Sequence, residues 1–485
     1  MFSQRKNSYL FSNLAVACLM LVGLLLLTPA CSGGGGVSGT PQQPSPTAVQ
    51  IKMGDAPADR LIGLEMNLTA AHFKDSKGNQ VNVLPATRRL EFLHVAGTLE
   101  PVALLQVPQG TYTEATLEGG NIHVSYVSTL SAFPWMGMSE VTSPGSSSIV
   151  VPISPPLTVR DQPIIVSVDF DVASFISFDP VSDLPILNNP KFTFSTSPIL
   201  ASGEPKPEQG GLEDMLGMAT TVSGSSFTMK LGQNGTLITL ATDNNTIFSN
   251  VSLATLPNMI VKVSGLTQAD GSLLAQQVEG LENQYGAETE GIIYFNWSET
   301  PTTWFWLSPQ DGNGTGFELT PTTALGQVVN VNVGTGTSYA VNTDGMDMTG
   351  ANFPFDANVD PTTMRFGQRV RVESSTGMIP DPGKTAGLIT AQKVTLEKQS
   401  VSGTVAKYTT SGGRSFFVLQ LPSDSYLTIL NRVQSPSAPY INVWQQAGTD
   451  LHGLTSIGNG DTVHVRGLLF SSSGSFVMVA QRIWK

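Results

Sequence analysis

Cysteine is almost absent from this chain of 485 residues, which contains only Cys18 and Cys31. Cys18 lies in an apolar N-terminal segment that we expect to be removed, so the mature chain would keep Cys31 alone. One cysteine excludes a disulfide framework and a cysteine-based zinc site. We therefore expect the mature domains to be stabilised by the burial of apolar side chains.

Positive charge is the second shortage. The chain has 25 Lys and Arg residues against 37 Asp and Glu residues, and its formal net charge is −12. Removal of residues 1–30 would take away Arg5 and Lys6 and no acidic residue, which changes the net charge to −14. The sequence has no basic cluster, and binding to a phosphate backbone requires one. We therefore expect no nucleic-acid partner.

Catalytic and metal-binding motifs are also missing. None of the five histidines belongs to an HExxH motif or lies three or four residues from another histidine. The sequence contains no GxSxG, P-loop or GxGxxG motif. We accordingly predict no catalytic residues, no metal, no cofactor and no enzymatic activity, although catalytic groups can also assemble from distant segments.

Only one long apolar run is present, Leu14–Leu27, and Arg5 and Lys6 precede it. This layout is typical of a secretory signal, and the segment Leu27–Ser32 (LTPACS) resembles the lipobox of bacterial lipoproteins. The resemblance implies a signal peptide at residues 1–30, lipidation of Cys31 and an extracytoplasmic, membrane-anchored location. Thr28 stands where the lipoproteins usually have Leu, so an ordinary signal or a tilted membrane span remains as an alternative.

The residues after the cysteine suit a tether. Residues 31–47 are rich in glycine and then in proline, which gives a flexible segment followed by a stiffer one. In the lipoproteins that this region resembles, Asp after the cysteine favours the inner membrane. Ser32 therefore implies the outer membrane.

Beyond Thr47 the sequence predicts an all-β protein. Short runs rich in Val, Ile, Thr and Phe alternate with turn residues, and long helical periodicity is lacking. We predict a β-sandwich at residues 48–200 and a linker at 201–215, where proline and charge accumulate. The sandwich segment carries Asp55-Ala56-Pro57, Pro108-Gln109-Gly110-Thr111-Tyr112 and Asp169-Phe170-Asp171. As a set these motifs resemble domain-of-unknown-function family 4382, which implies a β-sandwich and no known chemistry.

The second half contains a threefold repeat. The segments 261–282, 370–397 and 463–485 each begin with two valines around a polar residue and then contain Ala-Gln-x-Val/Ile. The valines should face the core, and the middle residues Lys262, Arg371 and His464 should face solvent. An aromatic strand opens each copy, at 226–231, 304–309 and 416–421. We predict three small β-barrels or sandwiches at 216–284, 288–398 and 399–485, and assign an insertion at about 311–363 to the second. The copies, most clearly the first, resemble domain-of-unknown-function family 5666.

Acidic residues provide two candidate sites. Asp55, Asp59, Asp169 and Asp171 would form a calcium site or a hydrolytic site if the strands brought them together. Otherwise they are turn residues and an exposed edge around Phe170. The segment 311–322 begins like a calcium loop, but Thr322 stands at the twelfth position, which favours a hairpin loop.

The richest aromatic segment is 294–309, which contains Trp297, Trp304 and Trp306. If Phe305 corresponds to the apolar Phe227 of the first copy, Trp304 and Trp306 face away from the core. The three tryptophans would then form a platform for sugar rings, although cross-strand tryptophans also serve simply to stabilise hairpins. We predict a lipid-anchored envelope protein that binds carbohydrate, adheres to polysaccharide or envelope proteins, or has a structural display role. The alternative is a carboxylate-based extracytoplasmic hydrolase.

Overall fold

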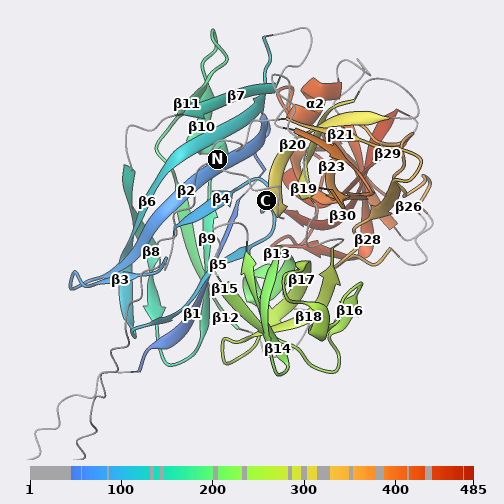
Figure 1. The fold of residues 1–485 in the computed structure, drawn as a ribbon. Coiled ribbons are helices and arrows are strands. Elements are labelled where there is room, and N and C mark those ends of the chain that lie inside the picture. The colour runs from blue at the N-terminus through green and yellow to red at the C-terminus, as the bar shows by residue number, and fades with distance from the viewer. Residues whose placement is uncertain are drawn as a thin grey trace, which may run out of the picture. The chain divides into compact units, whose positions relative to one another are not determined.

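The computed structural model consists almost entirely of β-strands, as the sequence predicts, with two short helices, α1 (Val172–Phe175) and α2 (Tyr426–Asn431) (Figure 1). It describes residues 45–55, 57–84, 87–130, 136–141, 147–199, 206–231, 237–281, 287–296, 303–313, 328–348, 353–376, 387–411, 414–431, 440–472 and 474–485. Among these residues no helix has the length and apolar character needed to cross a membrane.

Two sheets, the first mixed and the second antiparallel, form the N-terminal β-sandwich. The first has the order β12-β9-β1-β5, and the second has the order β3-β2-β6-β7, with β4 paired to β2 and β8 paired to β6. The long strands β2 and β6 run side by side (Figure 1). The bounds are β1 (Thr47–Asp55), β2 (Leu61–Asp75), β3 (Gln80–Asn82), β4 (Arg88–Glu91), β5 (Glu100–Val107), β6 (Gly110–Val127), β7 (Met136–Val141), β8 (Ser147–Val159), β9 (Ile164–Phe170), β10 (Ile176–Phe178), β11 (Pro185–Leu187) and β12 (Phe192–Pro198).

The alternation of apolar residues places one core between these two sheets. Val49 and Val166 from the first sheet pack in the same buried cluster as Leu64 and Leu117 from the second. The Pro-x-Gly-x-Tyr motif has a structural role here, because Tyr112 is buried and its hydroxyl donates to the carbonyl oxygen of Pro108 at 2.8 Å. The motif thus closes the turn between β5 and β6.

Three further modules follow, which we call barrels 1, 2 and 3, and their strand pairing is the same. In each, strand 1 pairs with strands 2 and 4, strand 2 with strand 3, strand 3 in parallel with strand 5, and strand 4 with strand 5. The predicted repeat is therefore confirmed. In barrel 1, strands 1 to 5 are β13 (Gly211–Ser223), β14 (Ser226–Leu231), β15 (Leu237–Ala241), β17 (Ile260–Thr267) and β18 (Leu273–Gly280). In barrel 2 they are β19 (Ala287–Asn296), β20 (Trp304–Asn313), β21 (Val329–Asn332), β23 (Arg369–Ser374) and a fifth strand interrupted into β24 (Gly387–Thr390) and β25 (Lys393–Leu396). In barrel 3 they are β26 (Lys398–Ser411), β27 (Arg414–Gln420), β28 (Tyr440–Leu451), β29 (Thr462–Ser472) and β30 (Ser475–Trp484).

The extra strands are short. β16 (Ile247–Ser249) pairs in parallel with β18, and β22 (Ser338–Val341) pairs in parallel with β25. β21 and β22 lie within the segment that the sequence assigned to an insertion, so part of that segment is barrel structure.

A close strand approach recurs at the same place in all three barrels. A Cβ atom added to Gly217, Gly291 or Gly403, each on strand 1, would contact a backbone carbonyl oxygen of strand 2. At Gly403 the separation from the Gln420 oxygen would be 2.5 Å. The strand pairing shifts register near each glycine, which is how a strand bends to close a small barrel.

The predicted linker is wrong in its second part. β13 begins at Gly211, and Leu212 and Met215 are buried in the core of barrel 1. The segment before it is fixed by Lys52 of β1, whose Nζ donates to the carbonyl oxygens of Pro207 (2.8 Å) and Gly211 (2.6 Å). Residues 201–205 lie outside the described residues.

The solvent-facing positions predicted for strand 4 are also wrong. Lys262 is 6 % exposed and Arg371 is 1 % exposed, and His464 is partly buried with its Nδ1 2.9 Å from the Ser402 hydroxyl. The alternation is correct, because the neighbouring valines fill the barrel cores. The outer faces are covered because the barrels pack against one another: Glu279 of barrel 1 forms ion pairs with both Lys262 and Arg371.

Candidate functional site

The outward face of β20 and β21 in barrel 2 carries Trp304 and Trp306, two of the predicted ligand-binding residues. Phe305 and Leu307 are fully buried, whereas Trp304 and Trp306 are partly exposed on the other face, as the alternation predicts. The two indole rings lie 6.0 Å apart between centroids, with an interplanar angle of 51°. Trp306 also packs against the hydrophobic cluster of the barrels.

Two asparagines complete this face, and neither is among the residues predicted from the sequence. In the strand register Trp304 lies opposite Asn332, and Trp306 lies opposite Asn330. The flanking Val329 and Val331 are buried, so the asparagines share the outward face with the tryptophans. The alternating Val-Asn-Val-Asn sequence at 329–332 could have indicated a strand with outward asparagines, but it lies in the segment predicted to be an insertion. Aromatic rings with neighbouring amides can stack on a sugar ring and hydrogen-bond to its hydroxyl groups.

The position of this face within the barrel corresponds to a known ligand-binding position in another five-stranded barrel. A five-stranded barrel in which strand 1 pairs with strand 4 and strand 3 runs parallel to strand 5 has the topology of the OB fold. OB folds bind oligosaccharides and oligonucleotides on the face of strands 2 and 3. β20 and β21 are strands 2 and 3 of barrel 2, so the tryptophans and asparagines lie on that face.

Two residues of the predicted sites lie outside the described residues. Trp297, the third tryptophan of the proposed platform, is one of them, and Cys31, the predicted lipidation site, is the other. Both therefore stay predictions.

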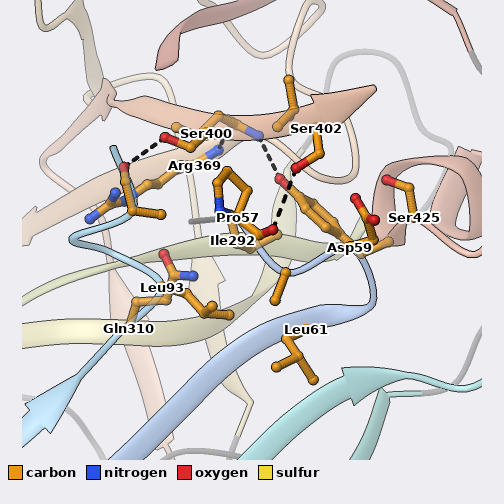
Figure 2. A pocket seen from close by; sticks show the side chains of 15 residues that line it. Pro57, Asp59, Leu61, Leu93, Ile292, Gln310, Arg369, Ser400, Ser402 and Ser425 are labelled. Atoms are coloured by element: carbon orange, nitrogen blue, oxygen red, sulfur yellow. Dashed lines mark hydrogen bonds between the residues drawn. The ribbon is translucent and has the colours of Figure 1, made fainter. Parts of the chain in front are cut away.

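A small cavity lies where the sandwich meets barrels 2 and 3 (Figure 2). Its volume is about 30 Å³, which admits water molecules but no sugar ring. Hydrogen bonds join its walls: Ser400 donates to the Ala96 carbonyl oxygen (2.7 Å), and Gln399 donates to the Tyr426 hydroxyl (2.7 Å). The full lining is Pro57, Ala58, Asp59, Leu61, Leu93, Ala96, Ile292, Gln310, Arg369, Gln399, Ser400, Val401, Ser402, Ser425 and Tyr426.

Asp59 is the acidic residue of this cavity. Burial, assisted by the nearby carboxylate of Asp424, raises the pKa of Asp59 to about 6. The Asp59 carbonyl oxygen accepts a hydrogen bond from the Tyr426 amide at 2.6 Å, which joins the sandwich to barrel 3. A carboxyl with this pKa can act as an acid or base, but the volume beside it leaves no space for a polysaccharide substrate.

The other acidic candidates have separate surroundings. Asp169 is exposed on β9 beside the buried Phe170, and the Asp171 carboxylate caps α1 by accepting from the Ser174 amide at 2.9 Å. Neither lines the cavity that contains Asp59. Asp55 ends β1, and its backbone lies opposite Phe170. In the part of the chain that the structure describes, no group of three or more His, Cys, Asp or Glu residues could hold a metal ion.

A cluster of charged residues around Arg371 is buried rather than exposed to a ligand. Arg371 lies within 4.0 Å of Glu279, Glu288, Glu373 and Glu397. Burial opposes the charged guanidinium, but the four carboxylates outweigh it and raise the pKa of Arg371. This cluster spans barrels 1 and 2 and serves to join them.

A comparison with protein-family models matches residues 217–279 to a domain of unknown function, DUF5666. The match covers most of barrel 1, in agreement with the resemblance seen in the sequence, and stops short of barrels 2 and 3. A search of curated proteins finds no match.

Proposed function

We propose that this chain is a lipid-anchored cell-envelope protein that binds carbohydrate through the outward face of β20 and β21. The observation that supports the proposal is the partly exposed pair Trp304 and Trp306 beside Asn330 and Asn332, on the strand 2–3 face of a barrel with OB topology. The net charge of −12 favours an uncharged polymer over a nucleic acid.

The equivalent face of barrel 1 supports the same interpretation. There strand 2 presents Thr228 and Lys230 outward, and Thr239 of strand 3 lies opposite Thr228. A barrel of this topology thus forms without tryptophan at these positions. Trp306 of barrel 2 also packs against the hydrophobic cluster of the barrels, and stacking against a ligand is the role that we assign to the partly exposed face of the pair.

The test compares Trp304→Ala with Lys230→Ala, its control on the face of barrel 1. The full chain is purified in detergent and run in native gels that contain soluble cellulose, chitin or β-glucan derivatives. We expect the parent and Lys230→Ala to be retarded by at least one polymer, and Trp304→Ala to lose most of that retardation with little change in melting temperature. A large fall in melting temperature, with a parent that no polymer retards, would instead show that the tryptophans only stabilise the sheet.

The anchoring part of the proposal is supported by the basic start, the apolar run and the lipobox-like segment before Cys31. The tether at 31–47 and the likeness of the sandwich motifs to domain-of-unknown-function family 4382 fit an envelope protein of this kind. Cys31→Ala should release processed protein from membranes or leave the chain uncleaved. Unchanged membrane association with an intact, unmodified N-terminus would favour a membrane span in place of a lipid anchor.

A further inference from the structure

Barrel 3 presents a second aromatic face at the position that corresponds to the tryptophan face of barrel 2. Its strands 2 and 3 are β27 and β28, and Phe416 lies opposite Trp444 in their register. The rings of this pair are stacked, with centroids 4.8 Å apart and an interplanar angle of 20°. Both side chains are partly exposed, whereas their neighbours in the sequence, Phe417 and Val443, are fully buried.

The same face continues along β28 with two residues whose side chains can hydrogen-bond to a ligand. Tyr440 is 43 % exposed and Asn442 is exposed, and the alternation places both on the side of Trp444. Tyr440 and Trp444 are four residues apart, which is about 13 Å along a strand. This length suits an oligosaccharide of several rings, with Asn442 placed to hydrogen-bond between two stacking residues.

The barrel does not require this face for its own core. The inner side of the same hairpin is filled by Phe417, Leu419, Ile441 and Val443, which are all fully buried. In barrel 1 the positions equivalent to the stacked pair lie in a hairpin whose outward residues include Thr228 and Thr239, and that barrel forms the same strand pairing.

The charges around the face restrict its ligand. Phe416, Trp444, Asn442 and Tyr440 are uncharged. Among the residues whose side chains the structure describes, Lys407 of β26 is exposed and lies opposite Val418. A nucleic-acid groove needs a series of such positive charges. Uncharged rings with hydroxyl groups match the aromatic and amide side chains better.

We propose that barrel 3 has a second carbohydrate-binding face, formed by Phe416, Trp444, Asn442 and Tyr440, so that the chain binds a neutral polysaccharide at two places. The ligand class rests on the function proposed for barrel 2, whereas the site itself rests on the geometry of β27 and β28. Two sites on one polymer would raise retention beyond that of either site, because the second contact becomes intramolecular.

The experiment uses the detergent-purified full chain in native gels containing soluble cellulose, chitin or β-glucan derivatives. Four proteins are compared: the parent, Trp304→Ala, the double variant Tyr440→Ser with Asn442→Ala, and the control Lys230→Ala. Tyr440 and Asn442 are exposed, so their replacement should leave the fold intact, and Trp444→Ala can be added with its melting temperature measured in parallel. We expect the double variant to reduce the apparent affinity about fivefold to tenfold in the gel that retards the parent.

The outcomes separate the two proposals. If Trp304→Ala abolishes retardation while the barrel 3 variants behave like Lys230→Ala, the barrel 2 site stands and the second face is refuted. If the barrel 3 variants reduce retardation and Trp304→Ala does not, the second face is supported and the function assigned to barrel 2 is refuted. A parent that none of the polymers retards would refute both.

Discussion

At the scale of single residues, Arg371 is a buried cation whose charge is matched by neighbouring carboxylates. It is 1 % exposed and lies among four glutamates contributed by two barrels. A buried ion cluster of this kind adds little net stability compared with an apolar core, but the loss of one member leaves the others uncompensated. The stability of the barrel 1–barrel 2 contact therefore depends on the guanidinium.

We predict that Arg371→Met lowers the free energy of unfolding by about 3–5 kcal/mol at neutral pH, because the buried glutamates lose their shared cation. Burial raises the pKa of Glu279, but Lys262, Arg371 and Lys393 together lower it below its ordinary value of 4.5. Its ionised form thus stabilises the folded parent above that pH, and this contribution is lost as the pH falls through the folded pKa. The deficit of the variant should therefore shrink in acid, which urea unfolding at several pH values would measure. Arg160→Met, at an exposed site, is the control.

Lys52 provides a second prediction at this scale. Burial, only partly offset by Glu208, lowers the pKa of Lys52 from 10.5 to about 7. Between these values the unfolded chain holds a proton that the folded chain has released, so this residue makes stability rise with pH by at most about 1.4 kcal/mol per pH unit. Lys52→Met should remove that rise between pH 7 and 9, whereas Lys74→Met, on the sandwich surface with its side chain 38 % exposed, should keep it. Parallel stability curves for the parent and Lys52→Met would contradict the prediction.

At the scale of strands and hairpins, the repeated glycine of strand 1 explains how each barrel closes. Gly403 approaches the Gln420 carbonyl oxygen so closely that a methyl group would displace strand 2. We predict that Gly403→Ala destabilises the protein by about 1–3 kcal/mol through overpacking. The matched control is Gly448→Ala on β28, which has open space around its Cα and should change stability by about 0.5 kcal/mol or less. Equal effects of the two substitutions in thermal unfolding would disprove the packing argument.

The elements also show what the sequence could and could not predict. Period-2 alternation correctly placed Phe305 inward and Trp304 outward, and Phe170 inward beside Asp169, because one buried face is enough to fix a strand's register. The same pattern failed for Lys262 and Arg371, since alternation does not reveal that a second module covers the outer face. The cavity around Asp59 could not be predicted from the sequence either, because its walls come from distant segments near residues 60, 95, 369 and 400.

At the scale of the whole molecule, the sandwich and the barrels are joined by buried polar contacts. The loop at 93–98 is held by Arg369, which donates to the His94 carbonyl oxygen (3.0 Å), and by Arg466, which donates to that of Ala96 (3.1 Å). On the other side Thr267 of barrel 1 donates to the Gln50 side chain at 2.7 Å. Residues 44–485 accordingly form one compact unit.

These contacts change the expectation for unfolding. A linker at 201–215 would let the two halves fold independently, whereas the observed contacts predict that calorimetry of the full chain gives one cooperative transition. Arg466→Ala should lower its temperature without splitting it, because several other contacts across the junction remain. Two well-separated transitions in the parent would show that the two halves fold independently.

Oxidative footprinting can show whether the outward face of β20 and β21 touches carbohydrate. The full chain is exposed to hydroxyl radicals with and without the polymer that retards it, and oxidation of each tryptophan is read by mass spectrometry. We expect the polymer to protect Trp304 and Trp306 and to leave unchanged the oxidation of Trp484, which packs beside His464. Equal oxidation of Trp304 and Trp306 in the presence and absence of polymer would contradict this expectation.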